Sequence, residues 1–174
     1  MEYTTLGRTE LNVSVASLGA GGGSALGLKQ GKSEEHAANI VRKALDLGVN
    51  FLDTANAYGS EGAVGMAIKD VPRDQVVIST KHHGAWGGTV YSAEDVVAGL
   101  ENSLRLLGTD YVDVFHLHGI APKYIDHALS IVPHLLKEQE KGKIRYLGMT
   151  ESAPPDPRHI SLTKALGEDC FDVI

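Results

Sequence analysis

The stretch Phe51-Leu-Asp53-Thr-Ala-Asn-Ala-Tyr58-Gly59 carries an acid and a phenol at the end of a short apolar strand. The strand, residues 49–52, runs directly into Asp53, and Tyr58 follows in the loop before Ser60 begins a helix. In a barrel or an open α/β sheet, the carboxyl ends of parallel strands open on one face, where ligands bind. The stretch therefore predicts a parallel α/β fold with a functional site at Asp53 and Tyr58.

The chain on both sides of this stretch repeats a cycle of strand and helix. Gly48 ends the helix before the stretch, and Ser92 with Asp95 forms a capping box before a later helix that ends at Gly108. Pro133 is expected to kink or split a long helix. The predicted strands are 15–18, 49–52, 76–80, 112–117, 144–147 and 171–174, and the predicted helices are 34–47, 60–68, 93–107, 124–141 and a last one ending at residue 166, after a loop at 154–157.

Six strands alternating with five helices, at intervals of roughly 25 to 37 residues, have the spacing of βαβ units. The strands are apolar rather than alternating, as expected for a parallel sheet buried on both faces. Residues 3–13 predict a hairpin with a glycine-containing turn. An open doubly wound sheet and a (β/α)8 barrel both fit this pattern. A full barrel takes about 250 residues, so this chain would be its first three-quarters.

Composition and charge limit the class of protein. The 174 residues are 43% hydrophobic and 22% charged, which is typical of one globular domain with a sizeable core. The net charge of −6 argues against nucleic acid or an anionic membrane surface as the main partner. We expect neither a membrane span nor a signal segment. Cys170 is the single cysteine, so no disulfide framework is predicted and the expected location is cytoplasmic.

Lys81 and His118 each end one of the next two strands, in the same structural position as Asp53. A phenol with a pKa near 10 donates a proton poorly near neutrality, and a nearby ammonium group lowers that pKa. Asp53 would keep the Lys81 ammonium charged in a pocket, and His118 would donate a hydrogen bond to a carbonyl oxygen. Together with Tyr58, these groups are suited to protonating an oxygen while hydride arrives at carbon.

The histidines also allow a metal-binding interpretation. His116 and His118 lie two residues apart on a strand, so their side chains share one face, and His82-His83 follow the neighbouring strand. With Asp53 they could ligate a metal, as in barrel hydrolases. Because Lys81 disfavours a second cation among them, we predict no metal site, a buried and hydrogen-bonded His116, and an exposed His82.

A glycine-rich segment, Gly19-Ala-Gly21-Gly22-Gly23-Ser24, follows the first strand. It matches a dinucleotide-binding fingerprint only in part, because serine stands where the third glycine should be. The next helix begins near Ser33, too late to direct its amide dipoles at a phosphate held by the glycines. We therefore predict a flexible loop that borders a pocket. Trp86, in a second glycine-rich segment after Lys81, either lines the pocket mouth or covers apolar surface.

Five segments together resemble the aldo-keto reductases. They are Leu6-Gly7-Arg8-Thr9-Glu10-Leu11-Asn-Val-Ser-Val, Asp53-Thr-Ala-Asn-Ala-Tyr58-Gly59, Ser79-Thr80-Lys81, Asp113-Val-Phe-His-Leu-His118 and Gly142-Lys-Ile-Arg-Tyr-Leu-Gly148. The resemblance covers the whole chain in the family's order. It implies an α/β fold of the TIM type, a (β/α)8 barrel that is incomplete here with about six strands. The chain would be one domain, residues 1–174, with 1–14 as an N-terminal hairpin cap.

The resemblance also implies NAD(P)(H)-dependent hydride transfer to or from a small aldehyde, ketone, alcohol or sugar. Tyr58 would be the general acid, Lys81 and Asp53 would tune its pKa, and His118 would orient the carbonyl. The cofactor, NADP(H) or NAD(H), is assigned to Gly22, Gly23, Asp53, Thr150 and Glu151. Where the family has Ser-Asn on the nicotinamide amide, Thr150 keeps a hydroxyl and Glu151 can only accept from the carboxamide NH2.

Two other functions stay open at this point. One is a metal-dependent barrel hydrolase that uses His116 and His118, and the other is a non-catalytic barrel that senses a nucleotide. A chain that stops at Ile174 would leave apolar strand edges unpaired, and such edges recruit other chains. By itself, the chain is therefore expected to self-associate. It is also expected to bind NADPH far more weakly than a complete family member, because the family's contacts to the adenosine end come from the last strands and loops.

Overall fold

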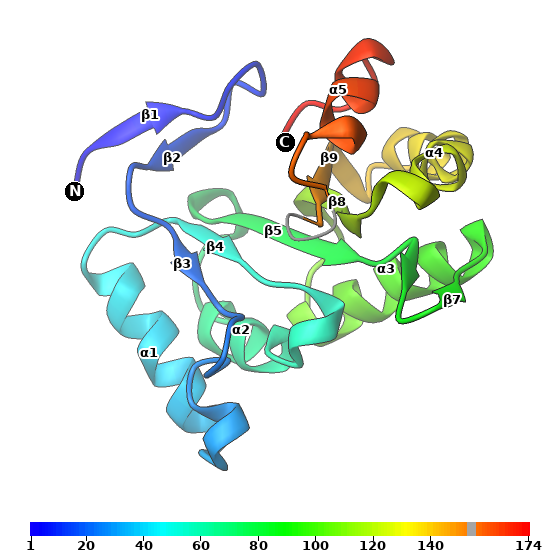
Figure 1. The fold of residues 1–174 in the computed structure, drawn as a ribbon. Coiled ribbons are helices and arrows are strands. Elements are labelled where there is room, and N and C mark those ends of the chain that lie inside the picture. The colour runs from blue at the N-terminus through cyan, green and yellow to red at the C-terminus, as the bar shows by residue number, and fades with distance from the viewer. Residues whose placement is uncertain (153–155) are drawn as a thin grey trace.

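The computed structural model describes residues 1–152 and 156–174, and its main element is a curved parallel sheet with helices along one side (Figure 1). Within these residues the sheet has five strands in the order β3-β4-β5-β8-β9, each parallel to its neighbours. A helix lies between each strand and the next, as parallel pairing requires. The strands are β3 (Leu18–Gly19), β4 (Phe51–Asp53), β5 (Val77–His82), β8 (Val112–Ile120) and β9 (Ile144–Glu151), and the helices are α1 (Glu34–Asp46), α2 (Glu61–Ile68), α3 (Ala93–Leu107), α4 (Ile125–Glu140) and α5 (Ile160–Gly167).

Two antiparallel hairpins flank the sheet. The predicted N-terminal hairpin is confirmed, with β1 (Tyr3–Thr5) paired to β2 (Asn12–Ser14). A second hairpin, β6 (Ala85–Trp86) with β7 (Thr89–Val90), follows β5 and was not predicted, because its two-residue strands carry no periodic signal. Short 3-10 turns complete the described elements, at η1 (Leu28–Gln30), η2 (Asn56–Tyr58), η3 (Arg73–Gln75) and η4 (Pro122–Tyr124).

The helix boundaries that were predicted from capping residues are confirmed. The Ser33 hydroxyl accepts from the backbone N–H of His36 at the start of α1. Ser92 and Asp95 form both bonds of a capping box at the start of α3, which ends at Gly108 with φ +67°. Each cap satisfies helix-end groups that have no partner inside the helix, so it fixes the boundary locally.

The predicted strand boundaries need correction. The first strand is Leu18–Gly19 rather than 15–18, because the Val15 N–H bonds to Glu2 and continues the hairpin. The strand predicted at 49–52 becomes Phe51–Asp53, and the one at 76–80 becomes Val77–His82. The strands predicted to end at residues 117 and 147 continue to 120 and 151.

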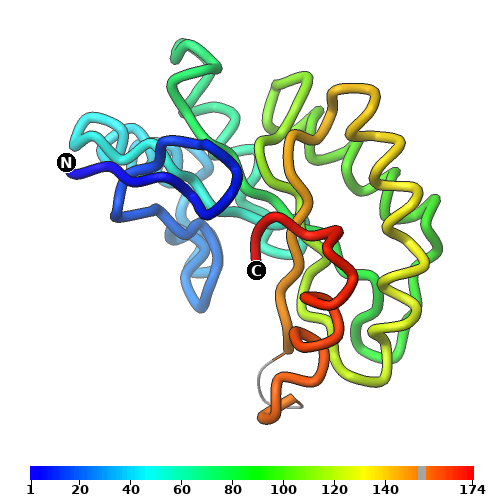
Figure 2. The backbone as a smooth tube through the Cα atoms, turned by 90° about the horizontal axis from the view of Figure 1, so that it is seen from above, coloured from blue at the N-terminus to red at the C-terminus, as the bar shows by residue number. Residues whose placement is uncertain are grey.

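Two predictions about the second half of the chain are wrong in part. Helix α4 runs through Pro133 without a break, so the long helix is not split there. The strand predicted at 171–174 is an isolated parallel bridge between Val173 and Gly148, which places the C-terminus beside β9 (Figure 2). Part of the loop predicted at 154–157 lies outside the described residues.

Apolar side chains pack on both faces of the sheet. The larger cluster fills the space between the sheet and its helices, with Leu52, Ile78, Phe115 and Leu147 each at most 1% exposed. A smaller cluster lies between the N-terminal hairpin and the other face of the sheet, at the beginnings of the strands, and contains Leu11, Val13, Val77 and Val114. The hairpin therefore covers the amino ends of the strands and leaves their carboxyl ends open.

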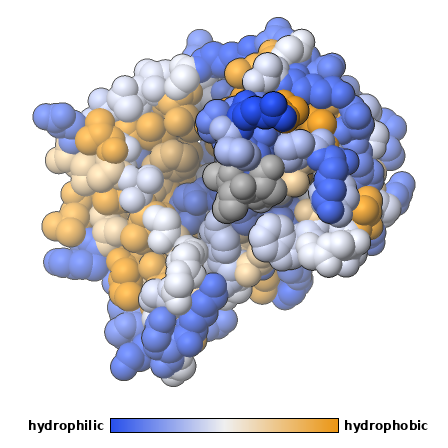
Figure 3. All heavy atoms as spheres, in the orientation of Figure 1, coloured by the Kyte–Doolittle hydropathy of each residue, from blue (hydrophilic) through white to orange (hydrophobic). Residues whose placement is uncertain are grey.

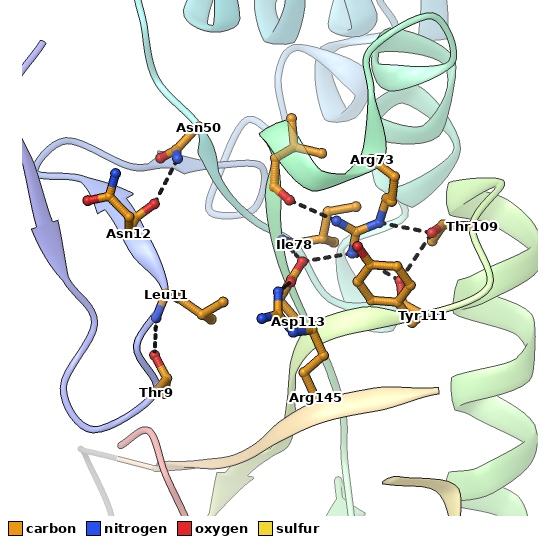
Figure 4. A network of polar contacts seen from close by, with 11 residues as sticks. Thr9, Leu11, Asn12, Asn50, Arg73, Ile78, Thr109, Tyr111, Asp113 and Arg145 are labelled. Atoms are coloured by element: carbon orange, nitrogen blue, oxygen red, sulfur yellow. Dashed lines mark hydrogen bonds and ion pairs between the residues drawn. The ribbon is translucent and has the colours of Figure 1, made fainter. Parts of the chain in front are cut away.

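The amino ends are also joined by a buried carboxylate (Figure 4). Asp113 at the start of β8 is 1% exposed. Its oxygens accept from Arg73 Nη2 at 2.7 Å, from Arg145 Nη1 at 2.7 Å and from the backbone N–H of Ile78 at 2.9 Å. One carboxylate thus joins β5, β8, β9 and the turn before β5, so Asp113 has a structural role.

The surface keeps several apolar side chains exposed. Figure 3 shows apolar atoms over β2, β3 and the adjoining part of α1. Val15 is 60% exposed, Leu47 is 62% exposed and Tyr3 is 48% exposed. In the part of the chain that the structure describes, no helix is long and apolar enough to span a membrane.

Candidate active site

The carboxyl ends of β4, β5 and β8 bring three of the predicted site residues together. Asp53 ends β4, and Lys81 and His118 lie near the ends of β5 and β8. Asp53 is in register with Ser79, and Lys81 is in register with His116. Because successive side chains of a strand point to opposite faces, these four side chains lie on the same face of the sheet. Tyr58 joins them from the 3-10 turn η2 after β4.

Lys81 is held by two oxygens. It is 5% exposed, and its Nζ donates to Asp53 Oδ1 at 2.6 Å and to the Thr54 carbonyl at 2.7 Å. The Ser79 hydroxyl donates to the same Asp53 oxygen at 2.8 Å. Burial lowers the pKa of Lys81, and the charge and hydrogen bond of Asp53 oppose that shift. The carboxylate is therefore what favours the charged ammonium in this buried position.

The pKa of Tyr58 departs from its ordinary value in the direction opposite to the prediction. Burial raises the pKa of its hydroxyl, and the charge of Asp53 raises it further. The Lys81 ammonium lies 5.2 Å from the centre of the Tyr58 ring and donates to Asp53 and Thr54. Because its charge is offset by Asp53, it does not favour the phenolate, and Tyr58 stays protonated at neutral pH.

His118 faces Tyr58 as a neutral imidazole. Its Nε2 lies 3.5 Å from the Tyr58 hydroxyl, at the outer limit of a hydrogen bond, and the two rings meet edge to face at 5.5 Å. Burial lowers the pKa of His118 to about 3, and the nearby His83 and Lys81 add to the effect. An oxygen atom bound between these two side chains could accept from both.

A pocket of about 460 Å³ opens beside Tyr58 and His118. Trp86 lines it while remaining 56% exposed, which supports the first of the two alternatives left open for Trp86, a position at the pocket mouth. The other lining residues are Ala57, His83, Gly119, Thr150, Glu151 and Ser152. Of the predicted site residues, Tyr58, His118, Thr150 and Glu151 thus share one concave surface with a mixed aromatic and polar lining, which is typical of small-molecule sites, whereas Asp53 and Lys81 do not line it.

Comparisons with known proteins agree with this arrangement. The chain matches the model of the aldo/keto reductase family over residues 17–166. The chain belongs to the aldo/keto reductase family. It is 38% identical over 157 residues to L-galactose dehydrogenase of Arabidopsis thaliana, a match that covers 86% of this chain and 48% of the relative. It is 36% identical over 161 residues to aldo-keto reductase YhdN of Bacillus subtilis, with 86% and 47% covered.

Among solved structures, the holo form of an aldo-keto reductase from Bacillus halodurans matches with a TM-score of 0.71 and 30% identity. The match covers 87% of this chain and 50% of that structure. The chain therefore spans about half the length of these three relatives. The predicted fold class is confirmed, since the structural relatives are (β/α)8 barrels and the described residues form part of one.

The residues assigned to the cofactor by resemblance do not all lie together. Thr150 and Glu151 line the pocket beside His118. Gly22 and Gly23 lie in the loop after β3, where their carbonyls accept from Lys29 and Gln30. Neither glycine lines the pocket that contains Tyr58. The loop contains these internal hydrogen bonds, and its flexibility stays a prediction.

Within the described residues, no group of three or more His, Cys, Asp or Glu side chains is placed to hold a metal ion. His116 is buried as predicted, but its Nδ1 has no hydrogen-bond partner among these residues, and burial lowers its pKa to about 4. His82 is partly buried rather than exposed, because its ring packs against Gly99 of α3 and Tyr91.

Two contacts at the site were not predicted from the sequence, although both residues, His83 and Gly21, were named there in other roles. His83 stacks on His118, and its position could have been found because residues 79, 81 and 83 continue one alternating face. Gly21 lies against the Tyr58 ring so closely that a Cβ there would be 2.5 Å from Tyr58 Cε2. Nothing in the sequence signals the contact of Gly21, since it depends on how the loop folds back.

Proposed function

We propose that the whole protein is an NAD(P)(H)-dependent oxidoreductase acting on a small aldehyde, ketone, alcohol or sugar. The observation that carries the proposal is the contact set at the carboxyl ends of β4, β5 and β8. There, Lys81 Nζ lies 2.6 Å from Asp53 Oδ1, and the Tyr58 hydroxyl lies 3.5 Å from His118 Nε2. The nicotinamide cofactor supplies or accepts the hydride when it is bound.

Tyr58 is proposed to donate the proton in carbonyl reduction. Burial raises the pKa of its hydroxyl, so the group is protonated and available as an acid at neutral pH. His118, neutral because its pKa is lowered to about 3, donates from Nε2 to the same substrate oxygen and orients it. The Lys81–Asp53 pair lies beside the phenol, and the charge of Asp53 raises the pKa of Tyr58 and so keeps its hydroxyl protonated until the proton is transferred.

The residues at the end of β9 fit a nicotinamide carboxamide. The Thr150 hydroxyl oxygen accepts from the Gly119 N–H at 2.8 Å, which leaves its own O–H free to donate. Glu151 Oε1 is paired to His159 Nδ1 at 2.5 Å, whereas the buried Oε2 has no partner among the described residues. We propose that Thr150 donates to the carboxamide oxygen and Glu151 Oε2 accepts from its NH2.

The relatives support a choice of substrates and conditions for the first assays. The similarity to a plant protein named L-galactose dehydrogenase supports aldoses as one class to test beside simple aldehydes and ketones. We propose NADP(H) as the first cofactor and NAD(H) as the second, and a cytoplasmic protein on the strength of its single cysteine.

The test is a turnover assay on the purified whole protein. Nicotinamide absorbance is followed with NADPH and NADH against aldehydes, ketones and aldoses, and with NADP+ and NAD+ against sugars. Quenching of nicotinamide fluorescence measures binding in the same samples. Turnover supports the oxidoreductase, whereas nucleotide binding without turnover of any substrate would favour the sensor function.

Elemental analysis of the same protein separates the oxidoreductase from a metal-dependent hydrolase. We expect no stoichiometric tightly bound zinc, manganese or iron, because the charge of Lys81 acts on His116 and His118 and disfavours a second cation between them. About one metal ion per chain, lost when His116 and His118 are replaced, would support the hydrolase.

A further inference from the structure

Three aromatic rings stack face to face at the mouth of the pocket. The His118 and His83 rings lie 4.4 Å apart at an interplanar angle of 5°, and the His83 and Trp86 rings lie 4.5 Å apart at 21°. The His118 and Tyr58 rings meet at 85°, with their centroids 5.5 Å apart. His118 therefore stacks on the face of His83 and meets Tyr58 at a steep angle, and the stack fixes the plane of its imidazole.

His83 also contacts the backbone of His118. Its Nδ1 lies 2.9 Å from the His118 carbonyl oxygen. A carbonyl can only accept, so Nδ1 carries the proton and the tautomer of a neutral His83 is fixed. One side chain thus stacks on the His118 ring and bonds to the His118 main chain.

The backbone at this point explains why such a contact is needed. The pairing of β8 with β9 shifts register between Leu117 and Ile120, and Gly119 adopts a left-handed φ of +63°. Bulges of this kind leave main-chain groups out of the ladder and re-aim side chains. Here side chains replace the ladder bonds, since His83 donates to the His118 carbonyl and Thr150 Oγ1 accepts from the Gly119 N–H.

We propose that His83 is a positioning residue that holds His118 in the orientation that aims its Nε2 at the Tyr58 hydroxyl. The inference rests on the proposed function, because the orientation matters only if His118 and Tyr58 bind one substrate oxygen. Trp86 backs the other face of His83 and limits its rotation. His83 does not touch the Tyr58 hydroxyl in this arrangement and acts through His118.

Removing the His83 ring also changes the surroundings of His118. The titratable groups that act on His118 are Asp53, Lys81, His83 and His116, with the Tyr58 hydroxyl against its Nε2. Burial is the main cause that lowers the pKa of His118, and the neighbouring His83 is the second cause. Without His83, the His118 ring is less buried and lacks that neighbour, so its pKa should rise.

The experiment compares three His83 variants of the whole protein. His83→Ala removes ring and donor, His83→Phe keeps the stacked face, and His83→Asn keeps a donor toward the carbonyl. His36→Ala, on the exposed surface of α1, is the matched control. The readouts are kcat and KM for a reduced carbonyl, Kd for NADPH by fluorescence, and the titration of His118 by imidazole NMR.

We expect His83→Ala to lower kcat by about 10- to 100-fold, because a misplaced group costs that much without loss of binding. The Kd for NADPH should stay within about twofold and the pKa of His118 should rise by about one unit or more. His83→Phe and His83→Asn should each recover part of the kcat. A role in folding alone would instead lower the melting temperature and leave the kcat of the folded fraction unchanged.

An unchanged kcat and an unchanged His118 titration in all three variants would overturn the proposal. If His83→Ala fails to fold, His83→Phe and His83→Asn carry the same comparison. A wild-type protein that reduces no carbonyl would contradict the proposed function, and that failure is distinguishable because it is seen before any variant is made.

Discussion

Replacing Gly21 by alanine should displace the proposed acid without altering it chemically. An added Cβ would lie 2.5, 2.6 and 2.8 Å from Cε2, Cδ2 and Cζ of Tyr58, whereas ordinary contact begins at 3.4 Å. The ring or the loop must therefore move by roughly 0.9 Å. A displacement of about 1 Å can cost on the order of 100-fold in rate, so we expect kcat to fall by about that factor.

The matched control is Gly19→Ala, two residues earlier, where an added Cβ would meet no atom within 4 Å and φ is not in the left-handed region. Both variants are assayed in the whole protein for kcat, for NADPH binding and for melting temperature. Gly21→Ala should lose turnover with nearly unchanged nucleotide affinity, whereas Gly19→Ala should match the wild type. Equal turnover in Gly21→Ala and wild type would refute the argument that the reaction rate depends on the position of the Tyr58 ring.

Three further predictions concern stability and association. Asp113→Ala leaves the Arg73 guanidinium without its buried partner and should cost about 3–5 kcal/mol in the free energy of unfolding; an unchanged urea midpoint would contradict this. Burial lowers the pKa of His116 from 6.5 to about 4, so the unfolded state binds the proton first, and stability should fall by a few kcal/mol as pH drops through that window. A urea midpoint that is constant between those pH values would show that His116 is not buried and neutral. With Val15 60% and Leu47 62% exposed, the 174-residue chain by itself should self-associate, and light scattering from a monodisperse 18.5 kDa monomer would disprove it.

Sequence pattern was sufficient where the determining interactions are local or periodic. The βαβ spacing and the apolar strands predict a parallel sheet, and the polar residue at each strand end then places Asp53, Lys81 and His118 on one edge. Caps such as Ser33 and Gly108 mark helix ends because their hydrogen bonds and dihedral angles are local.

Long-range contacts account for what the sequence did not predict. His118-Gly119 and Gly148 interrupt the apolar runs of β8 and β9, so hydropathy stops both strands several residues early, although backbone pairing continues to Ile120 and Glu151. The direction of the Tyr58 pKa shift depends on where the Lys81 ammonium points, which only the folded chain decides. The contact between Gly21 and Tyr58 depends in the same way on the path of a loop.

The claim that Tyr58 is the proton donor is tested most directly by Tyr58→Phe in the whole protein. The variant keeps the ring that packs on Gly21 and meets the His118 ring at 85°, and it removes only the hydroxyl. We predict that carbonyl reduction falls by about 10²-fold or more, because a positioned acid typically contributes about 10²–10⁴-fold, while NADPH binding stays nearly intact. Turnover at the wild-type rate in Tyr58→Phe would contradict the account.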